Sequence, residues 1–227
     1  IYGYSQDMVI RRNTLRKTLG VVMDPIQEIN YQKDTTLLLL VAAQRAGYKI
    51  FYIEQSDMFI ENCVPKASMS CIKVFEHPEK WYNKQVPFVG ALEMLDVILM
   101  RKDPPFDSEY IYSTYILEAA ERRGCLVVNK PSSLRDCNEK IFATQFPECT
   151  PPILVSRKKT LLKDFLAEHN DVVLKPLDGM GGKSIFRVQK HDSNVNVILE
   201  TLTREGEQTI MAQKYIPEIA VGDKRIL

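Results

Sequence analysis

The sequence predicts two folded parts, a doubly wound α/β domain with a parallel sheet followed by an α+β region. Residues 18–54 have the pattern strand, helix, strand that builds a parallel sheet. Two more apolar strand patterns, at 95–101 and 125–129, flank a helix pattern. After Pro131 short strands and helices surround a glycine-rich loop. A chain of 227 residues is long enough to bury a core in each part.

The first part can be read element by element. Residues 18–24 form an apolar run that stops at Asp-Pro, which indicates a buried strand followed by a turn. Residues 34–47 begin with a capping aspartate and end with glycine, as a helix does, and residues 48–54 favour a strand. We predict two short strands in 58–76 with a turn near Asn62, and irregular structure at 77–92.

The later elements follow the same signals. Residues 107–124 predict a helix that ends in basic residues and glycine, as the helix dipole favours. Residues 133–146 predict one helix or a pair of short ones. The remaining predicted strands are 152–156, 171–175, 184–189 and 208–216, and the remaining predicted helices are 157–170 and 194–206.

The change of pattern places a domain boundary near 130–135. We expect an N-terminal extension at 1–17, the α/β domain at 18–132, and an α+β unit after it. The chain begins with Ile and its first methionine is Met8, so we interpret residues 1–7 as a tag remnant or an incomplete start.

Composition indicates a cytoplasmic protein and gives no sign of a nucleic-acid or membrane partner. The formal net charge of +1 gives no global field that would favour nucleic acid or a membrane surface. The longest apolar run, residues 37–43, is too short to cross a bilayer. The five cysteines are odd in number and contain no Cys-x-x-Cys pair, which favours reduced thiols over a disulfide framework or a metal site.

The stretch "DVVLKPLDGMGGKSIFRV" at 171–188 raises the question of a phosphate-binding loop. The stretch does not match a P-loop, because Leu177 occupies the position of the first P-loop glycine. It does not match a Rossmann motif either, because a strand pattern follows the glycines where that motif has a helix. A glycine hairpin between antiparallel strands remains, and it would cover an anion as a flap. Strand alternation puts Lys175 on the same face as Val173. An ordinary hairpin with a solvated lysine stays open as the alternative.

Several separated blocks resemble one family. "LGVVMDPIQEIN", "DVILMRKDPPFD", "VVNKPSSLRDCNEKIF", "LKPLDGMGG" and "MAQKYIP" with "GDKRIL" stand in the order found in prokaryotic glutathione synthetases, which are ATP-grasp ligases. The resemblance runs from about residue 19 to residue 227. It implies an N-terminal α/β domain before the ATP-grasp region, with a first subdomain at 133–205 and the start of a second at 206–227. We expect that region to be incomplete, with its metal ligands beyond Leu227 and little turnover from this chain alone.

The resemblance implies a nucleotide site. Lys140 and Lys175 match lysines that contact nucleotide phosphates, and Arg225 matches a catalytic arginine near the transferred phosphate. Asp223 would meet the ribose. The flap would consist of Gly179, Met180, Gly181 and Gly182. The adenine hinge, which offers backbone groups to the base, would consist of Gln213, Lys214, Tyr215 and Ile216.

The resemblance also implies a peptide site at the carboxyl ends of the parallel strands, where open α/β sheets bind ligands. Asp24 and Ser132 are candidates, with Arg101 as an anion clamp and Asp103 as the partner of an ammonium group. Without the resemblance, Arg101 would be interpreted as part of an ordinary ion pair at a strand end.

The implied reaction joins γ-glutamylcysteine and glycine at the expense of ATP, through an acyl phosphate. The implied cofactors are ATP and Mg²⁺, with Mn²⁺ as a substitute, and the implied assembly is a homo-oligomer, specifically a tetramer. Two alternatives remain at this point. One is another ATP-grasp carboxylate–amine ligase, and the other is a nucleotide-binding module without catalysis.

Overall fold

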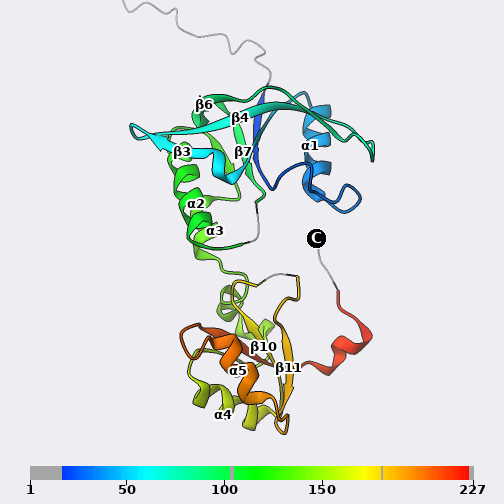
Figure 1. Ribbon diagram of the computed structural model, residues 1–227, viewed down its shortest axis with the longest axis vertical. Coiled ribbons are helices and arrows are strands. Elements are labelled where there is room, and N and C mark those ends of the chain that lie inside the picture. Colours follow the sequence, from blue (N-terminus) through cyan, green and yellow to red (C-terminus); the bar gives the residue numbers. More distant parts are fainter. Residues whose placement is uncertain (1–16, 103–104, 180, 225–227) are drawn as a thin grey trace, which may run out of the picture. The chain divides into compact units, whose positions relative to one another are not determined.

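The computed structural model describes residues 17–102, 105–179 and 181–224 (Figure 1). Their contacts fall into two compact units, which are described separately. Unit 1 comprises Ile1–Asp103 and Ser108–Ser132, and unit 2 comprises Pro104–Asp107 and Ser133–Leu227, each within the described residues.

Unit 1 is a mixed sheet with a parallel centre. Strands β2 (Lys49–Ile53), β1 (Thr18–Val22), β7 (Val97–Met100) and β8 (Leu126–Val128) lie side by side, each parallel to the next. The predicted α/β class and all four of these strands are confirmed. Strand β1 is buried along most of its length, as expected for a parallel strand covered on both faces.

One helix covers each face of this sheet. Helices α1 (Thr35–Arg45) and α2 (Ser108–Glu121) lie on opposite sides of it in Figure 1. Helix α1 begins where predicted, because the Asp34 carboxylate accepts the Leu37 N–H at 2.7 Å. Its buried side chains Leu37 and Leu40 pack with Leu19 and Tyr52 in one core cluster.

Antiparallel strands extend the unit 1 sheet beyond β2, and two predictions about this region were wrong. Strand β4 (Val64–Val74) is eleven residues long, not short, and pairs antiparallel with β2 and with β3 (Met58–Glu61). Residues 77–92 are not irregular throughout, because β5 (Tyr82–Lys84) and β6 (Phe88–Ala91) also pair with β4. The predicted turn near Asn62 is confirmed, with positive φ at Asn62 and Cys63.

Unit 2 contains a four-stranded antiparallel sheet with two helices on one face. Its strand order is β11 (Phe186–Gln189), β10 (Asp171–Pro176), β12 (Ile210–Lys214), β9 (Ile153–Ser156). Helices α4 (Lys159–His169) and α5 (Val195–Thr203) pack over it and bury Val172 and Leu174. The predicted pair of short helices in 133–146 is present as α3 (Pro131–Asp136) and a 3₁₀ turn at Phe142–Gln145.

Candidate functional site

The open face of the unit 2 sheet carries Lys175. Val172 and Leu174 of β10 point into the core, so Val173 and Lys175 point to the opposite face. The Lys175 ammonium donates a hydrogen bond to Gln213 Oε1 at 2.6 Å. Gln213 lies directly opposite Val173 in the β10–β12 pairing and therefore shares this face. The predicted hairpin is also present, because β10 and β11 are antiparallel.

Lys140 reaches the glycine loop from the turn after α3. Its ammonium donates to Gly179 O at 2.7 Å and to Leu177 O at 3.4 Å, and it pairs with Glu139 Oε1 at 2.7 Å. Its side chain is 11% exposed, whereas that of Glu139 is 61% exposed. Lys140 is thus a largely buried cation held against the loop backbone.

Sequence reasoning missed Asn138, which organises this turn. Its Oδ1 accepts the Lys140 and Ile141 N–H groups, each at 3.1 Å, and its Nδ2 donates to Leu177 O at 3.2 Å. The asparagine therefore fastens the start of the Lys140 turn to the start of the glycine loop. The contact spans 39 residues of sequence, so no local pattern could have indicated it.

The two lysines create a local excess of positive charge. Burial lowers the pKa of Lys175, and the nearby Lys140 charge lowers it further, whereas Glu139 acts in the opposite direction. Two ammonium groups share one carboxylate, which is itself mostly in solvent. Such a cluster fits a bound polyanion, whose charge would offset the repulsion and the desolvation of both cations.

The glycine loop has backbone geometry that glycine permits. Gly181 and Gly182 have φ of +64° and +75°, in the region that side chains disfavour. A Cβ on Gly179 would lie 2.8 Å from Pro176 Cγ. Met180 lies outside the described residues.

Some backbone N–H groups of the predicted hinge, residues 213–216, already have acceptors within the fold and are not free to bind a ligand. The Lys214 N–H donates to Pro152 O at 2.9 Å and the Tyr215 N–H donates to Asp171 O at 3.0 Å. Within the described residues the Ile216 N–H has no acceptor, so it is the donor left for a ligand. Asp223 is exposed and forms no hydrogen bond or ion pair in the described part of unit 2. Arg225 lies outside the described residues.

Arg187 is a second residue that sequence reasoning missed. Its guanidinium lies 3.6 Å from the Tyr215 ring centre and holds the Asp171 carboxylate through Nε and Nη2, at 3.0 and 2.6 Å. The hydrogen bond from Arg187 lowers the pKa of Asp171. Because Asp171 O also binds the Tyr215 N–H, Arg187 fixes the hinge from two sides.

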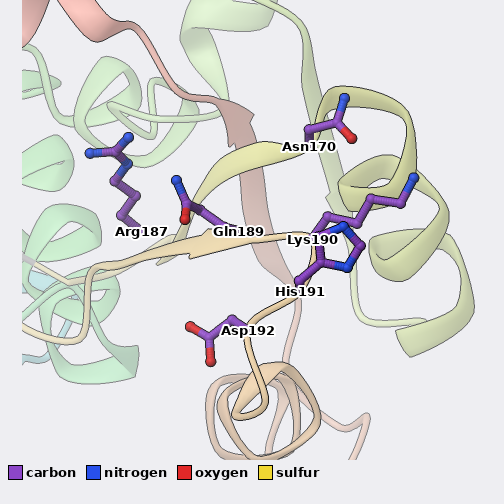
Figure 2. Close-up of a pocket in the computed structure, with 6 residues that line it drawn as sticks. All are labelled: Asn170, Arg187, Gln189, Lys190, His191 and Asp192. Atoms are coloured by element: carbon purple, nitrogen blue, oxygen red, sulfur yellow. The ribbon is translucent and has the colours of Figure 1, made fainter.

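A hollow of about 640 Å³ adjoins β11, and none of the predicted site residues lines it. Figure 2 shows its lining, in which the side chains of Arg187 and Lys190 extend in opposite directions. The Arg187 side chain belongs to the hinge contacts, and 49% of it is exposed. The hollow is open to solvent and lies beside the sheet edge.

Two of the predicted peptide residues, Asp24 and Arg101, lie at the carboxyl ends of β1 and β7. The Arg101 N–H continues the sheet by donating to Val22 O at 2.7 Å, and its Nε donates to Thr36 Oγ1 at 3.1 Å. Asp24 pairs with Lys102 at 2.7 Å, a partner that the sequence did not indicate. Asp24, Thr36 and Arg101 line a cavity of about 270 Å³.

Two peptide candidates remain. Asp103 lies outside the described residues. Ser132 is half-buried in the first turn of α3 and does not line the cavity. Across the described ranges, no group of three His, Cys, Asp or Glu side chains is placed to hold a metal ion. In the same ranges, no helix has both the length and the apolar character needed to span a membrane.

Comparison with known families identifies the chain. A family model described as the N-terminal domain of prokaryotic glutathione synthetase matches residues 18–135, and one described as its ATP-grasp domain matches 139–227. The chain belongs to the prokaryotic glutathione synthetase family. The two described clusters fall in different domains of that family, the Asp24–Arg101 cavity in the first and the Lys140–Lys175 pair in the second.

Curated glutathione synthetases are similar along most of the chain. Those of Pseudomonas aeruginosa and Vibrio cholerae are 58% and 55% identical over 209 residues, which is 92% of this chain and 66% of each relative. The chain therefore spans slightly less than two thirds of the length of these relatives.

Solved ATP-grasp structures share the fold at low sequence identity. A RimK domain protein of Sphaerobacter thermophilus has a TM-score of 0.55 at 16% identity, covering 88% of this chain and 64% of that one. D-alanyl-alanine synthetase A of Vibrio cholerae has a TM-score of 0.54 at 10% identity, covering 89% and 61%. These similarities confirm the predicted fold class.

Proposed function

We propose that this chain is part of a glutathione synthetase and carries its peptide site and much of its nucleotide site. The reaction is ATP-dependent ligation of γ-glutamylcysteine and glycine to give glutathione, ADP and phosphate. The curated relatives carry this name at 53–58% identity. The observation that carries the proposal in the structure is the pair of crowded lysines, Lys140 and Lys175, beside a glycine hairpin.

The reaction proceeds in two group transfers. The cysteinyl carboxylate attacks the γ-phosphorus of ATP. The new O–P bond gives an acyl phosphate, and ADP leaves as its bond to the γ-phosphorus breaks. The glycine amine then attacks the acyl carbon, the C–N bond forms, and phosphate leaves as the amine loses its proton. Charge moves across the phosphoryl oxygens in the first step, so fixed cations near them lower its barrier.

The residues of unit 2 bind and position the nucleotide. Lys140 and Lys175 would face its phosphates, and the loop around Gly181 and Gly182 would close over them and exclude water. The Ile216 N–H would donate to the adenine edge, on a hinge that Arg187 holds in place. Asp223 would approach the ribose, and Arg225 would act at the transferred phosphate.

The residues of unit 1 bind the peptide. Arg101 would hold a carboxylate of γ-glutamylcysteine, and Asp24 and Asp103 would lie near its polar groups, with Ser132 beside them. Mg²⁺, or Mn²⁺ in its place, would neutralise phosphate charge during the transfer. The protein would be a cytoplasmic homo-oligomer, a tetramer by family resemblance. A reducing compartment suits its cysteines, none of which is paired.

The proposed nucleotide role of Lys175 can be tested by titration. Lys175→Ala removes one charge-assisted phosphate contact and should weaken ATP binding about tenfold to a hundredfold in calorimetry. Lys183→Ala is the matched control, because Lys183 is an exposed lysine of the same loop. Equal ATP affinity in the parent and in Lys175→Ala would contradict the assignment.

The proposed reaction has its own test. Phosphate release from ATP should require glycine and γ-glutamylcysteine together, and should fail when another dipeptide replaces γ-glutamylcysteine. Release with many acyl acceptors would indicate a different carboxylate–amine ligase. These release assays use the full-length enzyme, because little turnover is expected from this chain alone. ATP binding without release by the full-length enzyme would indicate a nucleotide-binding module.

A further inference from the structure

A second cavity of unit 1 has no part in the site described above. It measures about 210 Å³, and its polar lining comes from β2 and β4, the turn after β2, and β5. We call it the Tyr52 cavity. Its polar residues are Tyr52, Glu54, Asp57, Ser68, Ser70 and Lys84. The volume is below the roughly 300–1,000 Å³ of pockets for drug-sized ligands, so it suits a small head group.

The floor of the Tyr52 cavity contains a buried hydroxyl with no partner. Tyr52 and Ser70 lie opposite each other in the β2–β4 pairing, so both side chains project from one face of the sheet. Ser70 is 4% exposed, and its hydroxyl has no hydrogen-bond partner among the described residues. No fully enclosed side-chain oxygen or nitrogen in those residues lacks a partner, so this hydroxyl opens into the cavity. Buried hydroxyls are normally hydrogen-bonded, so this one is suited to meet a ligand.

One wall of the cavity carries two ordered carboxylates. Tyr52 Oη accepts the Ile26 N–H at 3.2 Å and donates to Glu54 Oε1 at 2.6 Å. Asp57 Oδ2 accepts the Glu54 N–H at 3.2 Å, and the Glu54 carboxylate accepts the Asp57 N–H in return. Within the described residues no Lys, Arg or His pairs with either carboxylate. The wall therefore presents negative charge that is fixed in position and not neutralised.

The opposite charge comes from Lys84. Its ammonium lies 5.2 Å from the centre of the Tyr52 ring, a cation–π distance. Among the described residues it has no carboxylate partner. A single small cavity thus contains a carboxylate pair, a separate ammonium group and a free hydroxyl.

We propose that the Tyr52 cavity binds the head group of an α-amino acid. The ligand's ammonium would lie beside Glu54 and Asp57, in place of the Asp103 partner expected from the sequence, and its carboxylate beside Lys84 and the Ser70 hydroxyl. Both charges of a zwitterion on one carbon would then meet the opposite charge, and the free hydroxyl would gain a partner.

Two molecules could supply this head group, a free amino acid or the glutamyl end of a γ-glutamyl peptide. The sheet favours the second source, a point that rests on the proposed function. Glu54, Asp24 and Arg101 follow the adjacent strands β2, β1 and β7, which continue to pair there through Met23 N–H to Ile53 O and Arg101 N–H to Val22 O. Two strand spacings separate Glu54 from Arg101 by roughly 10 Å. An extended α-linked dipeptide spans roughly 7 Å, and a γ-linkage lengthens it.

The charge pairing can be tested by removing each partner in turn. Calorimetry would compare γ-glutamylcysteine with glutaryl-cysteine, which lacks the ammonium, and with the α-amide, which lacks the carboxylate charge. Each analogue should bind the parent protein about tenfold or more weakly. In Glu54→Gln, the difference in affinity between γ-glutamylcysteine and glutaryl-cysteine should nearly vanish. In Lys84→Met, the difference in affinity between γ-glutamylcysteine and the α-amide should nearly vanish. Gln keeps an oxygen for the Tyr52 hydroxyl, which protects the fold.

Controls separate this proposal from the proposed function. Glu61→Gln is the matched control, since Glu61 is an acid of unit 1 that pairs with Lys66 outside the cavity. ATP binding should be equal in all these variants, because the proposed nucleotide residues lie in unit 2. A failure of ATP binding in the parent would count against the proposed function and leave the head-group test intact.

The same titrations distinguish the two sources. If free glutamate competes with γ-glutamylcysteine, and if Lys84→Met weakens the binding of both, the cavity binds the glutamyl end of the dipeptide. Glutamate or glycine binding that is sensitive to Lys84→Met but does not compete with the dipeptide supports a free amino acid. Equal affinities for the parent ligand and both analogues, or deficits that persist unchanged in the variants, would overturn the proposal.

Discussion

The buried charge of Lys175, the lysine proposed to bind nucleotide phosphate, acts against the stability of the fold. Its pKa is lowered, so the folded protein bears a cost when the lysine is charged. Between the folded pKa and the ordinary value of the unfolded chain, the unfolded state binds more protons, and stability rises with pH. This contribution of Lys175 is therefore most unfavourable at neutral pH and fades as pH rises through the folded pKa.

Lys175→Met should consequently unfold at a higher urea concentration than the parent at neutral pH, while it binds ATP more weakly. The difference between the two proteins should shrink as the pH rises from the lowered pKa of Lys175 towards the ordinary pKa of lysine, because the parent loses its buried charge over that range. Urea unfolding at both pH values measures this. Lys183→Met, an exposed change in the same loop, should show no such pH-dependent difference.

Arg101 tests the peptide site at the same scale. Its guanidinium is positioned by hydrogen bonds to Thr36 Oγ1 at 3.1 Å and Thr35 Oγ1 at 3.4 Å. Arg101→Ala should raise the concentration of γ-glutamylcysteine that is required, with ATP affinity nearly unchanged. Steady-state titration of each substrate measures both effects. Parallel losses for the two substrates would place Arg101 outside the peptide site.

Residue types and motif order were sufficient to propose roles for Lys140, Lys175 and Arg101. They did not indicate which residues these side chains contact. Asn138 contacts Leu177, and Arg187 stacks on Tyr215, across long stretches of sequence. Strand alternation does not distinguish Arg187 from any other polar residue on an exposed strand. The sequence also did not indicate that the N–H groups of Lys214 and Tyr215 have acceptors within the fold.

Among the elements, those with their own local signals were predicted well. Helix α1 has a capping aspartate and a following glycine, and β1 has a continuous apolar run before Asp-Pro, so both were found. Strands β5 and β6 were missed because they are three and four residues long and mostly exposed. They exist by pairing with β4, and that pairing partner is not visible in their own sequence.

Gly20 makes the centre of the parallel sheet sensitive to added volume. A Cβ at this position of β1 would lie 2.7 Å from Leu95 Cδ1 and 3.3 Å from Ile98 Cγ1. Gly20→Ala should lower the free energy of unfolding by about 1–3 kcal/mol, as overpacking of a core does. Chemical denaturation measures this loss. The loss should be smaller when Leu95→Val is also present, since valine lacks the Cδ1 atom, and strictly additive effects would contradict this explanation.

On the scale of the whole molecule, the proposed ligands fall on different units. ATP at one hundred times its dissociation constant stabilises the part that binds it by about 2.7 kcal/mol. Hydrogen exchange with ATP should therefore slow mainly in unit 2, around the Lys140 turn and β10. The dipeptide should slow exchange mainly in unit 1, at the ends of β1 and β7. Exchange by mass spectrometry measures both, and equal slowing of both units by ATP alone would contradict the assignment.

Under the proposed function, the contact between Lys140 and the glycine loop would make nucleotide binding an exchange of acceptors. The Lys140 ammonium donates to the carbonyl oxygens of Gly179 and Leu177. A phosphate that claims this ammonium must compete with those oxygens, and each contact it wins loosens the anchor of the hairpin. The three N–H donors of this ammonium already meet Glu139, Gly179 and Leu177, so a phosphate that took one of them from the loop would free the proposed flap to move.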